Sequence, residues 1–241
     1  MPESDVLILA VARQPGGLLL AGMTTDRDPK TGLRWVRLVP DAGVFQLDDL
    51  RYADGSLVRP GDVVRLPLGE PDPAPPHVEN VRVELTEAPL ELVRRLSPER
   101  REAFFRDHLD PAPREVLADR ARSLCLVHPD LLTAIVEHDE ETGQFDTKFS
   151  VAIASGQLNE EGKPKYLRSR DDIIVTDIYW RALMRSWLSG EDDFLEFDIT
   201  ELRERLGDLY LVISLSPKGT PRIVGVHAVP EYDVRLDEDA L

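Results

Sequence analysis

The stretch RSRDDIIVTDIYWRALMRSWL, residues 168–188, begins as an apolar strand pattern and then places Tyr179, Trp180 and Arg181 side by side. An earlier stretch, TGLRWVRLVP at residues 31–40, also sets a tryptophan among arginines. The chain has only three tryptophans and a formal net charge of −16, so this recurrence in each half needs an explanation. Aromatic rings beside guanidinium groups can stack and neutralise nucleotides. They also occur where a sheet core carries an arginine that reaches solvent along its aliphatic stem.

The composition is that of a globular chain in a reducing compartment. Its 241 residues, 42% hydrophobic and 31% charged, can bury enough surface for one or two domains without disulfides. Cys125 is the single cysteine and lies among apolar neighbours, which indicates a buried, inert thiol. The apolar run at residues 6–12 is short and follows acidic residues. We therefore expect a cytoplasmic protein with no signal peptide and no membrane span.

Strand patterns dominate both ends of the chain, with helical patterns between them. Five apolar or alternating segments separated by turn signals lie at residues 5–13, 18–25, 33–40, 59–68 and 78–85. Two helices follow, at residues 97–109 and 113–124, and Ser97 is placed to cap the first. A helix at 198–208 interrupts five further strand candidates, at residues 131–139, 147–155, 171–183, 209–217 and 221–231.

Two sets of about five short strands predict two small barrels joined through a helical middle. The expected limits are a first barrel at residues 1–88, a helical connector at 89–123, a second barrel with a helical insertion at 124–230, and an acidic, frayed tail at 231–241.

Several short motifs support a resemblance to a known family. VLILAVARQPGGLLLAGMTT at residues 6–25 is followed by LRWVRLVP, YADGS and RPGDVVRLPL, and then by a proline-rich segment with His77. In the second half, VTDIYWRAL and LYLVISLSP are similar to an Asp-x-x-Trp-Arg strand and a later strand of the same family. Over residues 5–230 the chain resembles the bacterial dual OB-containing domain family. The resemblance implies a mostly β protein with α insertions, in which a helical middle segment links two OB-like small β-barrels. It also implies nucleic-acid binding in bacterial defence or DNA processing.

The first candidate site is the set Arg13, Arg34, Trp35 and Arg37. An aromatic platform with phosphate-neutralising neighbours on an OB sheet would use these residue types. The alternative places Trp35 in the barrel core and the arginines on the outer face.

The second candidate site is the set Tyr179, Trp180 and Arg181, with Asp177 just before it. On a continuing strand, Asp177 could orient an arginine or a substrate amine. The alternative is an internal ion pair between Asp177 and Arg181 that fixes the end of the strand.

The third candidate is the stretch KPKYLRSR, which combines four basic residues, no acidic one and a central aromatic: Lys163, Lys165, Tyr166, Arg168 and Arg170. The net charge of −16 opposes nucleic-acid binding over the whole surface but allows a local basic cleft. A basic, aromatic loop at a barrel mouth is where OB modules grip strands. A solvated loop is the alternative.

Motifs of catalysis are sparse. The sequence has no nucleophile elbow, no phosphate-binding glycine-rich loop and no metal-binding histidine pair on a helix. Asp130, Asp146 and Lys148 match a short nuclease pattern in which two carboxylates hold a metal and a lysine stabilises charge. We therefore predict a non-catalytic binding module for single-stranded DNA, RNA or nucleotides, with no cofactor and no metal. An adaptor that meets a protein partner of the same system through its acidic surface is the alternative, and a metal-dependent nuclease comes third.

Overall fold

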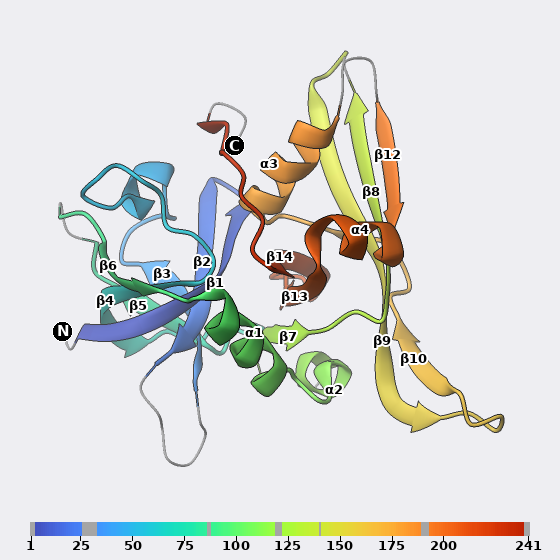
Figure 1. The fold of residues 1–241 in the computed structure, drawn as a ribbon. Helices are drawn as coiled ribbons and strands as arrows, with labels where there is room; N and C mark the ends of the chain where they lie inside the picture. The colour runs from blue at the N-terminus through green and yellow to red at the C-terminus, as the bar shows by residue number, and fades with distance from the viewer. Residues whose placement is uncertain are drawn as a thin grey trace.

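The fold is mostly β, as Figure 1 shows for a computed structural model. The structure describes residues 3–25, 33–85, 88–118, 122–139, 141–188 and 193–238. Among them, no helix is long and apolar enough to cross a membrane.

The first half forms a closed five-strand barrel. Its strands are β1 (Glu3–Gln14), β2 (Gly17–Thr24), β3 (Trp35–Pro40), β4 (Asp62–Pro71) and β5 (Asn80–Val83). They pair in the order β1-β2-β3-β5-β4, and β4 pairs with β1 to close the circuit. The β3–β5 pairing is parallel and the others are antiparallel. A sixth strand, β6 (Glu91–Arg95), adds to β4, and a 3₁₀ helix, η1 (Leu47–Leu50), lies in the connection from β3 to β4.

Two short helices connect the halves, α1 (Pro98–Asp107) and α2 (Pro113–Ala118). The expected N-cap is confirmed, since the side chain of Ser97 accepts a hydrogen bond from the backbone N–H of Arg100. Residues 119–121 of the second expected helix lie outside the described residues, and β7 (Leu124–Val127) begins where that helix was expected to end.

The second half repeats the strand order of the first barrel. Its elements are β7, β8 (Leu131–Asp139), β9 (Gln144–Leu158), β10 (Pro164–Arg168), β11 (Ile173–Ile174), α3 (Ile178–Trp187), β12 (Phe194–Asp198), α4 (Ile199–Leu206), β13 (Asp208–Leu215) and β14 (Pro221–Val229). β8 pairs with β9, and both β10 and β11 pair with β9. Val175, just after β11, makes a parallel bridge to Ile223 of β14. β14, β13 and β7 then pair in that order. Because β7 leads into β8 along the chain, these strands complete the second barrel. The parallel bridge corresponds to the β3–β5 pairing of the first barrel.

Three hydrophobic clusters fill and join the barrels. Successive side chains of a strand point to opposite faces, so a single strand can contribute residues to two different clusters. In β1, Val6 and Ile8 enter the first barrel, while Leu7 and Leu9 point outward into a third cluster. This inter-barrel core joins β1, β2 and β3 to β7, β13, β14 and α1, and its buried members are Leu7, Leu9, Ala10, Ala12, Leu19, Ala21, Met23, Trp35, Val63, Phe105, Leu124, Leu126, Tyr210, Val212 and Val224. A strand buried on both faces needs apolar residues throughout, as β1 has. The expected domain limits stay a prediction.

The prediction of a strand at residues 171–183 is wrong for most of these residues. Only Ile173 and Ile174 form a strand, and Asp177 ends it by capping α3: its carboxylate accepts hydrogen bonds from the N–H groups of Tyr179 (2.8 Å) and Trp180 (3.1 Å). An aspartate before an apolar run is an N-cap signal as well as a strand residue. KPKYLRSR was expected to be a loop, and it forms β10, one arm of a hairpin with β9 that projects from the barrel (Figure 1).

The tail does not fray over its described part, residues 231–238. Tyr232 and Val234 pack against the cores of both barrels, and the Tyr232 hydroxyl donates to the carbonyl of Val226 at 3.0 Å. Two ion pairs also connect the tail to the rest of the chain. The carboxylate of Glu231 lies 2.6 Å from the guanidinium of Arg101, and that of Asp233 lies 3.2 Å from the guanidinium of Arg59. The tail is thus held by the junction of the two barrels.

Replacing Tyr179 with alanine should lower the free energy of unfolding by about 3–5 kcal/mol, the usual cost of truncating a buried aromatic side chain. Its ring lies in the core of the first barrel, although the residue belongs to a helix of the second half. Chemical denaturation followed by circular dichroism measures the change. The control is Tyr166→Ala, which removes a ring that is 39% exposed and should change stability by only about 0.5 kcal/mol. Equal losses for the two variants would contradict this packing.

Candidate functional site

Trp35 cannot act as a stacking platform. Its side chain is 5% exposed and lies on the outer face of β3, within the inter-barrel core. Neither reading of the sequence placed it there, because the core that covers it comes from the second barrel. The expected platform on the first barrel is therefore wrong.

Arg37 shares the outer face of β3 with Trp35 and joins a polar network between the barrels. Its guanidinium donates to Gln14 Oε1 (3.3 Å) and to Ser214 Oγ of β13 (3.4 Å), and lies 3.3 Å from His77 Nδ1. His77 Nδ1 in turn lies 2.9 Å from Ser123 Oγ. Burial lowers the pKa of Arg37 to about 10, with Glu79 opposing, while burial and the charge of Arg37 lower the pKa of His77 to about 4. This arginine therefore links the barrels and is not available to phosphate.

The other two arginines of the first set are exposed. Arg34 lies just before β3, and its backbone carbonyl accepts the N–H of Thr24 at 2.9 Å. Arg13 is the last residue but one of β1, and its N–H donates to the carbonyl of Thr176 at 2.8 Å. The structure thus separates Arg13, Arg34 and Arg37 into different surroundings.

The second candidate set is buried in two cores. Trp180 is fully buried in the second barrel, where its Nε1 donates to Thr147 Oγ1 at 3.2 Å and its ring meets Phe149 edge to face. Tyr179 points the other way into the first barrel and donates to the carbonyl of Val58 at 2.7 Å. Stacking of bases on either ring is therefore excluded in this fold.

Arg181 is also structural, and its expected ion pair with Asp177 does not form. The guanidinium donates to the carbonyl of Phe145 at 2.6 Å and lies over the Phe145 ring. Burial, followed by the nearby charge of Arg13, lowers its pKa to about 10. Asp177 instead accepts a third backbone N–H, from Val226 of β14 at 2.7 Å, and burial raises its pKa to about 7.

The third candidate set stays on the surface. Lys163, Lys165, Tyr166, Arg168 and Arg170 are exposed on and beside β10. Lys163 forms a surface ion pair with Glu161 at 3.0 Å. The side chains of Arg168 and Arg170 have no ion pair or hydrogen bond with any residue that the structure describes. In a chain with 45 acidic and 29 basic residues, these two arginines, which have no acidic partner among the described residues, are available to an external anion.

A pocket of about 510 Å³ opens beside these arginines, and we call it the barrel-two pocket. Tyr166, Arg168 and Arg170 line it from the hairpin and its extension. The rest of the wall is mostly apolar and comes from β9, α2, β11, β13 and β14, with two residues from the hairpin side. These residues are Val151, Ile153, Pro113, Leu117, Ile173, Ile213 and Pro221, with Leu167 and Ser169 from the hairpin side. Sequence analysis found the charged rim and missed the apolar floor, because residues from five separate elements form it.

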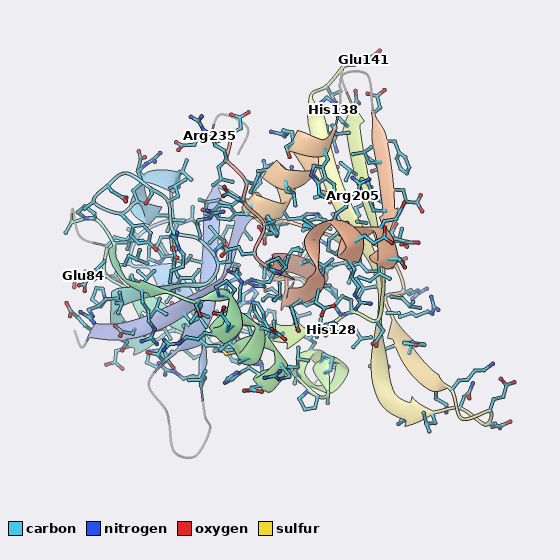
Figure 2. All side chains as sticks on the ribbon, viewed as in Figure 1. Glu84, His128, His138, Glu141, Arg205 and Arg235 are labelled. Atoms are coloured by element: carbon cyan, nitrogen blue, oxygen red, sulfur yellow. The ribbon has the colours of Figure 1, made fainter. Side chains whose placement is uncertain are left out.

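The three residues of the nuclease pattern do not come together. Asp146 pairs across the β8–β9 ladder with Glu137, whereas Asp130 precedes β8 at the other end of that ladder. Seven residues of strand separate Glu137 from Asp130, which is roughly 23 Å at about 3.3 Å per residue. Lys148 forms an ion pair with Glu137. The described residues contain no group of three acidic, histidine or cysteine side chains placed to hold a metal, and His128 and His138 lie apart on the second barrel (Figure 2).

Comparison with known protein families bears on residues 4–157. A family profile described as "Dual OB-containing domain" matches residues 4–157. No curated protein matches the sequence. Among solved structures, the chain is similar to a deletion mutant of the single-stranded DNA binding protein from Thermus aquaticus, at 15% identity over 98% of this chain and 96% of that one. The TM-score of that likeness is 0.22, so it carries no argument about fold or function.

The buried carboxyl of Asp177 predicts a pH dependence of stability. Its pKa is about 7 in the folded chain against an ordinary value of 3.8, so between these values the folded chain binds the proton that the unfolded chain has released. Stability should therefore fall as pH rises through this window, by up to roughly 1.4 kcal/mol per pH unit. Urea unfolding of wild type and Asp177→Asn from about pH 5 to about pH 8 tests this. The asparagine cannot ionise, so the variant should lack this loss, and the difference between the two free energies of unfolding should change across this window. Parallel profiles for the two proteins would refute it.

Proposed function

The chain belongs to the dual OB-containing domain family, and from this premise we propose that it binds single-stranded nucleic acid through its second barrel. OB barrels bind oligonucleotides on the face of their second and third strands. Each barrel of this chain has such a face, but the two faces differ in what covers them.

The first barrel has no free face of this kind. The outward side chains of β2 and β3, including Met23 and Trp35, lie in the inter-barrel core, and Arg37 reaches Ser214 of the second barrel. The corresponding strands of the second barrel are β9 and β10, and the hairpin that they form carries the exposed basic residues. This difference between the barrels is the observation that carries the proposal.

The hairpin supplies both chemistries that a single strand requires. Arg168 and Arg170 can neutralise phosphates, and the exposed ring of Tyr166 can stack against a base. Lys163 and Lys165 can join them where phosphate competes with their existing partners, such as Glu161 at Lys163. Neutralising about four phosphates on a single strand corresponds to a slope of about −3 in a plot of log affinity against log salt.

The acidic surface limits the affinity. A net charge of −16 repels a polyanion at long range. Attraction must therefore come from the basic residues of the hairpin. We expect dissociation constants in the micromolar range at physiological salt, weaker than those of proteins with a basic face.

We also infer that binding occurs without catalysis. The carboxylates of the short nuclease pattern lie at opposite ends of a strand ladder, so that pattern supports no metal-assisted cleavage. An adaptor that meets a basic protein through the acidic surface is the function to consider if nucleic acid does not bind.

Replacing Arg168 and Arg170 together with alanine should weaken single-strand binding and make the salt slope less negative by about 1.4, or about 0.7 for each phosphate contact. Fluorescence anisotropy of labelled single strands over a salt series measures both effects. The control is Arg94→Ala with Arg100→Ala, which removes the same charge from exposed positions on β6 and α1. Identical salt slopes for the two double variants would show that net charge, and not the hairpin, controls binding. No binding by wild type at low salt would favour the adaptor.

Incubation of the purified protein with single- and double-stranded DNA and RNA, in magnesium or manganese, should leave the substrates intact on denaturing gels. The reason is the separation of Asp130 from Asp146. Metal-dependent cleavage that disappears in Asp146→Ala would overturn the inference and restore the nuclease hypothesis.

A further inference from the structure

We propose that the barrel-two pocket takes in a single nucleobase that has been turned out of the bound strand. This inference rests on the proposed function, because it concerns the same hairpin. It goes further in assigning the pocket to one base, while the hairpin holds the neighbouring phosphates.

The size and lining of the pocket fit a base better than they fit a charged group. About 510 Å³ falls within the range of small-ligand sites, which are mostly apolar with a few polar groups at the edge. Val151 and Ile153 of β9 form one wall, and Leu117 of α2 forms another. These side chains can pack on both faces of a planar heterocycle and would exclude water from it.

The polar groups at the rim are held in place by the backbone. Ser169 lies between Arg168 and Arg170, and its N–H donates to the carbonyl of Val151 at 2.9 Å. Its Oγ also accepts the N–H of Val151 at 3.1 Å. Ser169 is thereby fixed to β9, so the two arginines on either side of it stay beside the pocket. A phosphate on each side of an inserted base would then meet a guanidinium without an acidic partner among the described residues.

The rim has one aromatic side chain, which favours one inserted base over a continuous stack. Among the described residues that line the pocket, Tyr166 is the only aromatic one. A platform for several stacked bases needs successive rings along the strand. One ring beside one apolar hollow instead predicts that a single position in the strand dominates affinity.

A second large pocket does not suit an anionic strand. It has a volume of about 560 Å³ beside η1 on the first barrel. Arg51 and Arg65 in its wall already pair with acids, and its lining includes five carboxylates that would repel phosphate: Glu3, Asp48, Asp49, Glu84 and Glu91.

Short strands with single abasic positions test the proposal. About four nucleotides is the smallest site of an OB barrel, so a strand of that length cannot slide to present another base. We expect removal of one particular base to weaken binding by roughly 5- to 150-fold, and removal of the others to have much smaller effects. Calorimetric titration of wild type at low salt with the four singly abasic strands and the intact strand measures this profile.

Variants that fill the pocket provide the second arm. Ile153→Phe and Leu117→Phe enlarge side chains on two different walls, so at least one should fold, as thermal unfolding will show. Either folded variant should give a flat abasic profile, because the base no longer enters, while the salt slope on longer strands stays that of wild type. Leu92→Phe, at a site that is 40% exposed on β6, is the matched control and should keep the wild-type profile.

The outcomes separate this inference from the function on which it rests. A flat abasic profile for wild type, with a salt slope that still depends on Arg168 and Arg170, would overturn the base pocket and leave strand binding intact. A position-dependent profile that survives both folded pocket-filling variants would also overturn it. No binding of any strand at low salt would overturn both proposals.

Discussion

The structure depends on the buried carboxylate of Asp177. It caps α3 through the N–H groups of Tyr179 and Trp180 and also accepts the N–H of Val226 in β14. A fully buried carboxylate is costly unless its lone pairs are satisfied, and here three backbone donors satisfy them. This one group therefore sets the direction in which α3 leaves the strand, and that direction sends Tyr179 into one barrel and Trp180 into the other.

Joining the barrels in this way makes them unequivalent. Each barrel has the same strand order with one parallel pairing. In the first barrel, however, the outward face of β2 and β3 is buried in the inter-barrel core. The Arg37–His77–Ser123 network extends the contact with hydrogen bonds. Under the function that we propose, the first barrel supports the second, and the hairpin of the second barrel meets the ligand. Fold alone would not distinguish the two barrels.

Charge is distributed in the same unequal manner. Most of the described arginines on the first barrel and the connecting helices are paired with carboxylates, as Arg59, Arg65 and Arg101 are, and the tail supplies some of those partners. The net charge of such an ion pair is zero, so it does not attract a polyanion. Arg168 and Arg170 have no such partner among the described residues, so the hairpin can be locally positive on an acidic protein. A global charge therefore describes the solubility of this chain better than its binding.

The sequence alone determined what depends on local periodicity. It predicted the first-barrel strands, the Ser97 cap, the buried Cys125 and a mostly β fold, because alternation, turn residues and caps act over a few neighbouring residues. The family resemblance was confirmed by the matching profile. The sequence alone did not determine the features that depend on contacts between residues far apart in the chain. Trp35, Arg37, Trp180 and Arg181 were candidates for the surface because their own segments do not show which face a second barrel or a helix will cover. The pocket was missed for the same reason: tertiary packing alone brings α2, β13 and β14 to the β9–β10 hairpin, since burial is a property of the whole fold and not of the segment.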